Sequence, residues 1–198
     1  MASKKQVQRK QRTVRWIIIA SIWTFFLAIG FAFVTRVLIQ SIGSTIISFI
    51  ILFAIILIGI LFDTIGTAVA AADEKPFHSK ASKKIYGAKK GIYLVKNADK
   101  VANFCNDVIG DISGVISGVI GAIIIINLTT TSPGLNELYL NIFLAGVISA
   151  LTVGGKAIGK YLAINYSTDV VFFTARLLTT FGKINFLDKK TRKNKRAY

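Results

Sequence analysis

The chain is poor in cysteine, histidine and acidic residues, and each shortage excludes a class of site. Cys105 is the only cysteine, so no disulfide can form within the chain. One cysteine and one histidine also cannot build a Cys/His metal cluster. The sequence shows no His-centred triad, no glycine-rich phosphate loop after a strand and no paired acids on a soluble scaffold, so we predict that the protein is not an enzyme.

Hydrophobic and basic residues are abundant instead. Of 198 residues, 53% are hydrophobic, and 25 basic residues against nine acidic ones give a formal net charge of +16. The basic residues fall in three blocks that alternate with apolar segments, which is the pattern of the positive-inside rule. We therefore predict a multi-pass plasma-membrane protein with both termini in the cytoplasm. Its basic residues face an anionic inner leaflet and not nucleic acid.

Four apolar segments are long enough to be predicted membrane spans. The first, residues 16–34, is too long for the apolar part of a signal peptide and has no cleavage site after it, which indicates an uncleaved anchor. The others cover residues 44–72, 101–128 and 135–152. The predicted fold is an all-α integral membrane protein with four transmembrane helices. Its predicted parts are a basic N-terminus (1–15), an anchor helix (16–38), a transmembrane domain (44–186) and a basic tail (187–198).

Residues 73–100 form the second basic block. Apolar residues recur among its lysines, as an amphipathic helix on the inner leaflet would require. A solvated charged loop is the alternative for residues 75–84. The apolar residues concerned are Ile85, Tyr86, Ile92, Tyr93 and Leu94.

The third apolar segment carries two acids, Asp107 and Asp111. An acid near the centre of a membrane helix costs roughly 2.5 to 3.5 kcal/mol on the insertion scale. Asn103, Asp107 and Asp111 are spaced four residues apart and so share one helical stripe. We predict that this stripe faces a polar or aqueous cavity.

Gly110, Gly114 and Gly118 also recur every four residues in this segment. Small side chains let another helix backbone approach closely. The pattern predicts helix packing, either within one bundle or between the subunits of a homodimer. Plain packing without any binding site is the simpler interpretation of the glycines alone.

Residues 153–163, VGGKAIGKYLA, resemble a motif of the membrane domain shared by the CNNM and CorB/CorC magnesium transporters. That motif reads hydrophobic-Gly-Glu-x-x-Pro-Lys-x-Leu-Ala. Four further segments resemble the family in the same order along the chain, and the likeness covers roughly residues 46–186. They are LFDTIGTAVAAAD (61–73), KKGIYLVKNADK (89–100), VIGD (108–111) and INYSTDVVFFTARLL (164–178).

The resemblance implies a core of three spanning helices with a cytoplasmic amphipathic belt, here preceded by the extra anchor. It also implies divalent-cation (Mg²⁺) transport or homeostasis, without the regulatory CBS domains of the family. The family binds its cation with polar groups from all three helices of that core. The candidate ligands for Mg²⁺ or Na⁺ in this sequence are Asp63, Thr64, Thr67, Asp107, Asp111 and Ser113; no other cofactor is expected.

Lys156 stands where the family has a ligating glutamate. Mg²⁺ needs hard oxygen ligands, and a lysine offers none. The ammonium would repel the ion, yet it could neutralise Asp63, Asp107 or Asp111 as a tethered counter-ion. Alternatively, Lys156 lies near the inner end of its helix and extends its charge to the interface. Further departures from the family are Ile65-Gly66 for Ser-Glu, Asp111 for Asn and Gly159 for Pro.

Two functions of different classes follow. The first is divalent-cation transport or homeostasis by a CorB/CNNM-type protein. The second is a degenerate, non-transporting relative that acts as a membrane-embedded interaction or regulatory subunit. A basic membrane-surface tether ranks third. The first two differ in whether the acids converge on a cavity that is free of Lys156.

Overall fold

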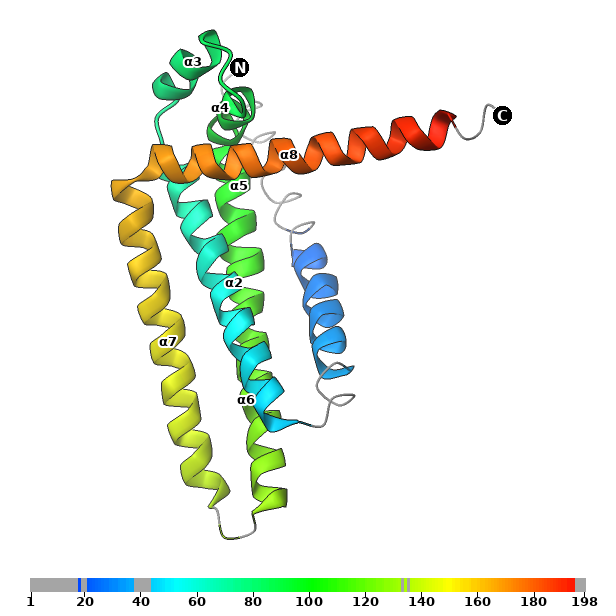
Figure 1. Cartoon of the computed structure of the whole chain (residues 1–198). Helices are drawn as coiled ribbons and strands as arrows, with labels where there is room; N and C mark the ends of the chain where they lie inside the picture. Colours follow the sequence, from blue (N-terminus) through cyan, green and yellow to red (C-terminus); the bar gives the residue numbers. More distant parts are fainter. Residues whose placement is uncertain (1–17, 19–20, 38–43, 133, 135, 195–198) are drawn as a thin grey trace, which may run out of the picture. The chain divides into compact units, whose positions relative to one another are not determined.

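The computed structural model describes residues 18, 21–37, 44–132, 134 and 136–194, with side chains up to residue 181. Within these ranges the chain is helical and contains no strand, which confirms the all-α class (Figure 1). A helix at Ser21–Val37 comes first. It is followed by α2 (Thr45–Ala71), α3 (Lys75–Ser82), α4 (Ala88–Lys96), α5 (Ala98–Asn103), the π-helix η1 (Phe104–Gly110), α6 (Asp111–Thr131), α7 (Glu137–Asn165) and α8 (Ser167–Asn194).

Three helical stretches are long and apolar enough to cross a membrane: Thr45–Ala71, Ala98–Thr131 and Glu137–Asn165. The shortest has 27 residues, whereas about 20 residues cross a hydrocarbon core of about 30 Å. Part of the predicted anchor (16–38), namely residues 16, 17, 19, 20 and 38, lies outside the described residues. The apolar helix Ser21–Val37 is shorter than the three spans, so a fourth span stays a prediction.

The chain forms two compact units that divide each long span. Unit 1 comprises residues 1–56 and 112–149, and unit 2 comprises residues 57–111 and 150–198. In unit 1, Ile116, Ile120 and Ile124 are buried and recur every four residues. They therefore form one apolar face of α6.

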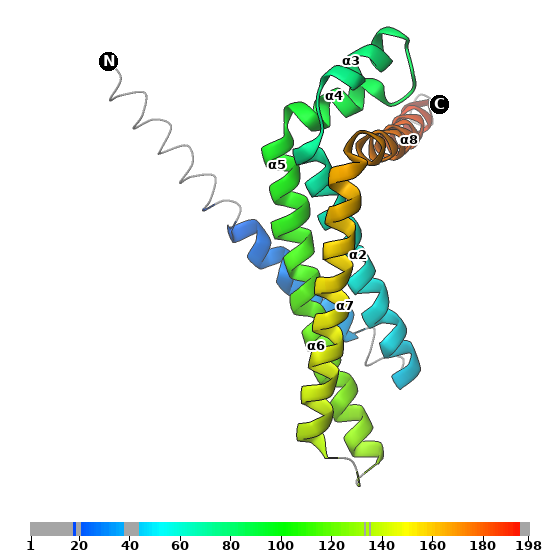
Figure 2. The ribbon, with the colours of Figure 1, turned by 90° about the vertical axis from the view of Figure 1, so that its left-hand side faces the viewer.

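The core of unit 2 joins the second part of α2 and the end of α7 to α3, α4 and α8. α8 runs crosswise to the second part of α2, α4 packs against α8, and α3 packs against α4 (Figures 1 and 2). Phe77 of α3 is fully buried, and its ring lies so close to Gly91 of α4 that a Cβ there would fall 2.5 Å from it. The small residues among the buried ones let these helices pack closely. The core residues are Ala68, Val69, Phe77, Leu94, Ala163, Val171 and Ala175.

Short connectors fix α3, α4 and α8 to the ends of the spans. α3 begins four positions after the last residue of α2, and α5 and α8 each follow the preceding helix after one residue. Gly87, with φ +88°, makes the left-handed turn before α4, a conformation that glycine adopts without strain. Of the residues for which a loop was the alternative (75–84), residues 75–82 are thus a helix, and residues 83 and 84 form a turn. Their position on a membrane surface stays a prediction.

Candidate functional site

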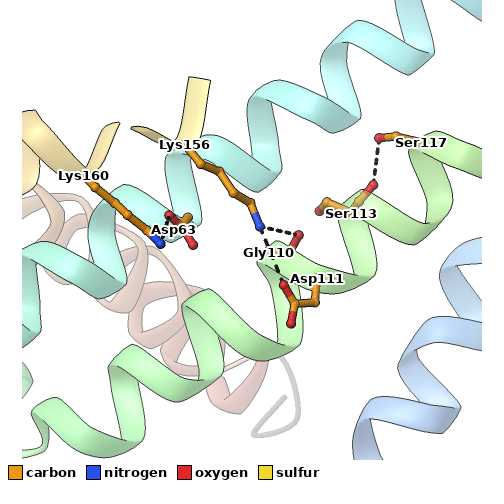
Figure 3. Close-up of polar contacts among 7 residues, drawn as sticks. All are labelled: Asp63, Gly110, Asp111, Ser113, Ser117, Lys156 and Lys160. Carbon is orange, nitrogen blue, oxygen red and sulfur yellow. Dashed lines mark hydrogen bonds and ion pairs between the residues drawn. The ribbon is translucent and has the colours of Figure 1, made fainter. Parts of the chain in front are cut away.

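Two ion pairs connect α7 to the other spans of unit 2 (Figure 3). Lys156 Nζ lies 3.6 Å from Asp111 Oδ1, and it donates a hydrogen bond of 3.4 Å to the carbonyl oxygen of Gly110. Lys160 Nζ lies 3.7 Å from Asp63 Oδ2. Because the two lysines are four residues apart, they share one face of α7. That face therefore presents two positive charges to two acids.

The pairs differ in burial. The Asp63 side chain is only 5% exposed, while that of its partner Lys160 is 52% exposed. The opposite holds for the second pair, in which the Lys156 side chain is 21% exposed and that of Asp111 72%. The first pair thus joins a buried acid to a half-exposed lysine, and the second joins a half-buried lysine to an exposed acid.

Glycines on α7 explain how the lysine-bearing turns reach α2. A Cβ at Gly155 would overlap Ile60, and a Cβ at Gly159 would overlap the Thr64 hydroxyl. Thr64 Oγ1 itself donates to the carbonyl oxygen of Ile60, at 2.7 Å. The absence of side chains at these two positions therefore permits the close contact of α7 with α2 that the Lys160–Asp63 pair requires.

The π-helix η1 supplies the second contact with α2. A Cβ at Gly66 would overlap Asn106 Oδ1 and would lie 2.9 Å from the Cβ of Cys105. A Cβ at Gly110 would lie 3.5 Å from Lys156 Nζ and 3.7 Å from Asp63 Oδ1. Single π turns inside helices occur frequently at functional sites. Here the turn brings the Asn106 amide, and the Gly110 carbonyl oxygen that accepts from Lys156, to the same region as the charged pairs.

Two buried oxygens in this region accept no hydrogen bond. They are Asp63 Oδ2, whose distance to Lys160 fits an ion pair but exceeds a hydrogen bond, and Asn106 Oδ1. A buried acceptor without a donor costs about 1 to 3 kcal/mol. Both atoms are therefore acceptors that a cation or a donor could still satisfy.

The other predicted ligands do not gather at this point. Asp107 is exposed, like Asn103 of the same predicted stripe, and Thr67 is half-buried. Ser113 belongs to unit 1, where its carbonyl oxygen accepts the Ser117 hydroxyl at 2.7 Å. In the part of the chain that the structure describes, no group of three or more His, Cys, Asp or Glu residues is placed to hold a metal.

Among the glycines predicted to pack, only Gly110 has near neighbours. Nothing lies within 4 Å of a Cβ placed at Gly114 or Gly118. Both glycines line an open groove of about 190 Å³ in unit 1, together with residues of α7 such as Asn141 and Leu144. In that unit the close contact is instead made by Gly121, against Ile148. Contact of Gly114 and Gly118 with a second subunit stays a prediction.

Sequence reasoning did not weigh Lys160 and Asn106. Lys160 could have been found, because it follows Lys156 by four residues and matches the lysine of the family motif. Asn106 could not, since a regular helix would have directed attention to Asn103, Asp107 and Asp111. The π turn changes which side chains of this segment face α2, and Asn106 lies against Gly66.

None of the three comparisons with known proteins found a match. A scan of protein-family models, a search of curated proteins and a search of solved structures each returned nothing for this chain. The likeness to the CNNM and CorB/CorC domain thus rests on the five sequence motifs alone.

Proposed function

We propose that this chain is a CorB/CNNM-type membrane protein in which two lysines of α7 replace the transported cation. It would act as a membrane-embedded interaction or regulatory subunit that does not carry Mg²⁺. The observation that supports this proposal is the pairing of Lys156 with Asp111 and of Lys160 with Asp63.

The chemistry of the pairs favours this function over resident Mg²⁺. Mg²⁺ requires near-octahedral oxygen ligands at about 2.1 Å. The two acids closest to the α7 lysines are each already balanced by an ammonium, so the local charge is neutral without an ion. An added divalent cation would have to displace a lysine or bear the repulsion of both.

The depth of the two ion pairs along the helices is consistent with lysines that serve as permanent counter-ions. From Thr45 to Asp63 the rise along α2 is about 27 Å, which is close to the full thickness of the hydrocarbon core, about 30 Å. If the second basic block (residues 73–100) lies at the cytoplasmic side, the two ion pairs lie near the inner boundary of that core. A lysine there can hold an acid with its ammonium and still reach the interface, as the half-exposed Lys160 indicates.

Divalent-cation transport is the second candidate. It is favoured by Asp63 Oδ2 and Asn106 Oδ1, which are buried and accept no hydrogen bond. In this case Lys160 would swing outward when the ion enters, and Asp63 would become a ligand.

Flux into proteoliposomes separates the two functions. Vesicles that contain the wild-type protein and a Mg²⁺-sensitive dye should take up Mg²⁺ no faster than protein-free vesicles, because the acids are already neutralised. Wild-type uptake that Asp63→Asn abolishes, and that Asp107→Asn leaves intact, would contradict this proposal and establish transport. Asp107 is the matched control because it is exposed and is not among the acids paired with lysine.

A further inference from the structure

Two cations lie against one aromatic ring in unit 2. Lys80 Nζ of α3 is 4.2 Å from the centroid of the Phe172 ring, and Arg176 Cζ of α8 is 4.4 Å from it. A cation within about 6 Å of a ring centroid is attracted by the π-system. Among the residues that the structure describes, neither cation has a carboxylate within 4 Å. The ring thus holds two positive charges that no acid neutralises.

The backbone and the first side-chain atoms of Arg176 pack against the turn before α4. A Cβ at Gly87 would lie 2.9 Å from Arg176 Cγ and 3.2 Å from its backbone nitrogen. One helical turn further on, the hydroxyls of Tyr86 and Thr180 are 3.3 Å apart. Arg176 is exposed beyond these contacts, so its guanidinium is held in place while remaining open to a ligand.

The α3–α4 segment that supplies Lys80 is rich in lysine. Glu74, the residue just before α3, is 3.3 Å from His78 in the first turn of that helix and so is engaged locally. Several further lysines of the α3–α4 segment are exposed. They are Lys83, Lys84, Lys89 and Lys90.

An apolar stripe on α8 begins at the residue after Phe172. Phe173, Leu177 and Phe181 are four residues apart and are 63%, 44% and 62% exposed. Residues at this spacing share one face of a helix. If α7 spans the membrane, α8 lies where headgroups meet acyl chains, since it starts one residue after the end of α7. Apolar residues on one face with cations beside them suit a helix lying in that plane.

We propose that Lys80, Phe172 and Arg176 form a binding site for the phosphate of an anionic phospholipid. The two cations bind the phosphate oxygens, and the acyl chains lie along Phe173, Leu177 and Phe181. This site differs from a diffuse attraction to the inner leaflet, because it depends on two particular cations and not on the total charge.

The test measures the thermal unfolding midpoint of the protein in phosphatidylcholine–detergent micelles. Phosphatidylglycerol is added in increasing fractions, and the midpoint is determined at each fraction. Phosphatidylglycerol should raise the wild-type midpoint. In Lys80→Gln/Arg176→Gln the lipid fraction needed for half the rise should increase roughly 25-fold, about fivefold for each cation removed. Lys96→Gln/Lys100→Gln removes the same charge from exposed positions elsewhere. It should change the lipid fraction needed for half the rise only little.

Three results would overturn the site. They are equal weakening in the two double variants, no effect of phosphatidylglycerol on the wild type, and an equal rise with inorganic phosphate alone. Lys80→Arg/Arg176→Lys keeps both charges and should retain most of the lipid effect. The single variant Lys80→Gln, which leaves the Arg176–Gly87 contact intact, should show the fivefold step if the double variant does not fold.

Discussion

Lys160→Ala is expected to lower the free energy of unfolding by about 3 kcal/mol. Removing one partner of a buried ion pair costs about 3 to 5 kcal/mol, because the other charge stays buried without compensation. The lower end applies here, since Lys160 is itself half-exposed while the Asp63 side chain is 5% exposed. Asp63 Oδ2 already accepts no hydrogen bond, so no donor replaces the lost ammonium.

Unfolding by denaturant in detergent micelles measures this effect. Lys160→Arg keeps the charge and should stay close to the wild type. The double variant Asp63→Asn/Lys160→Ala removes both charges and should recover most of the loss. If Lys160→Ala is as stable as the wild type, Asp63 does not depend on the lysine, and the pair does not stabilise the fold.

Gly66→Val should destabilise the protein by about 2 kcal/mol, within the usual range for overpacking. The new side chain would overlap the Asn106 amide and press on Cys105, both in η1. Neither can move without disturbing the π turn that also places Gly110 beside Lys156. The same unfolding measurement gives the value.

Gly154→Val is the matched control for this prediction. Gly154 is a helical glycine in the same unit, and nothing lies within 4 Å of a Cβ placed there. A valine at Gly154 should therefore change the unfolding free energy little. An equal loss in both variants would mean that the cost comes from valine in a helix and not from the contact of α2 with η1.

The spans were predictable because apolar runs of this length have few alternatives. The predicted segment 44–72 agrees with the helix Thr45–Ala71 to within one residue at each end, and 101–128 lies in the helix Ala98–Thr131. The predicted segment 135–152 ends at residue 152, yet α7 continues to Asn165. Its last turns carry glycines and lysines, which end the apolar run but not the helix, because tertiary contacts with α2 accommodate them.

The site was predictable only in part. Lys156 and Asp111 stood out as charges in apolar segments, and the structure places them 3.6 Å apart. The partner of Asp63 was not evident, since which lysine of α7 reaches it depends on the contact at Gly159. The exposure of Asp107 likewise depends on the π turn, which no spacing in the sequence reveals.

Thermal unfolding with and without Mg²⁺ tests most directly whether lysines replace the cation. The wild type should show little Mg²⁺-dependent shift. Lys156→Ala should unfold at a lower temperature, and Mg²⁺ should partly restore it by occupying the vacated positive position beside Asp111. A wild-type midpoint that rises with Mg²⁺ through binding to the folded state, and that no longer does so in Asp111→Asn, would contradict the replacement of the cation by lysine.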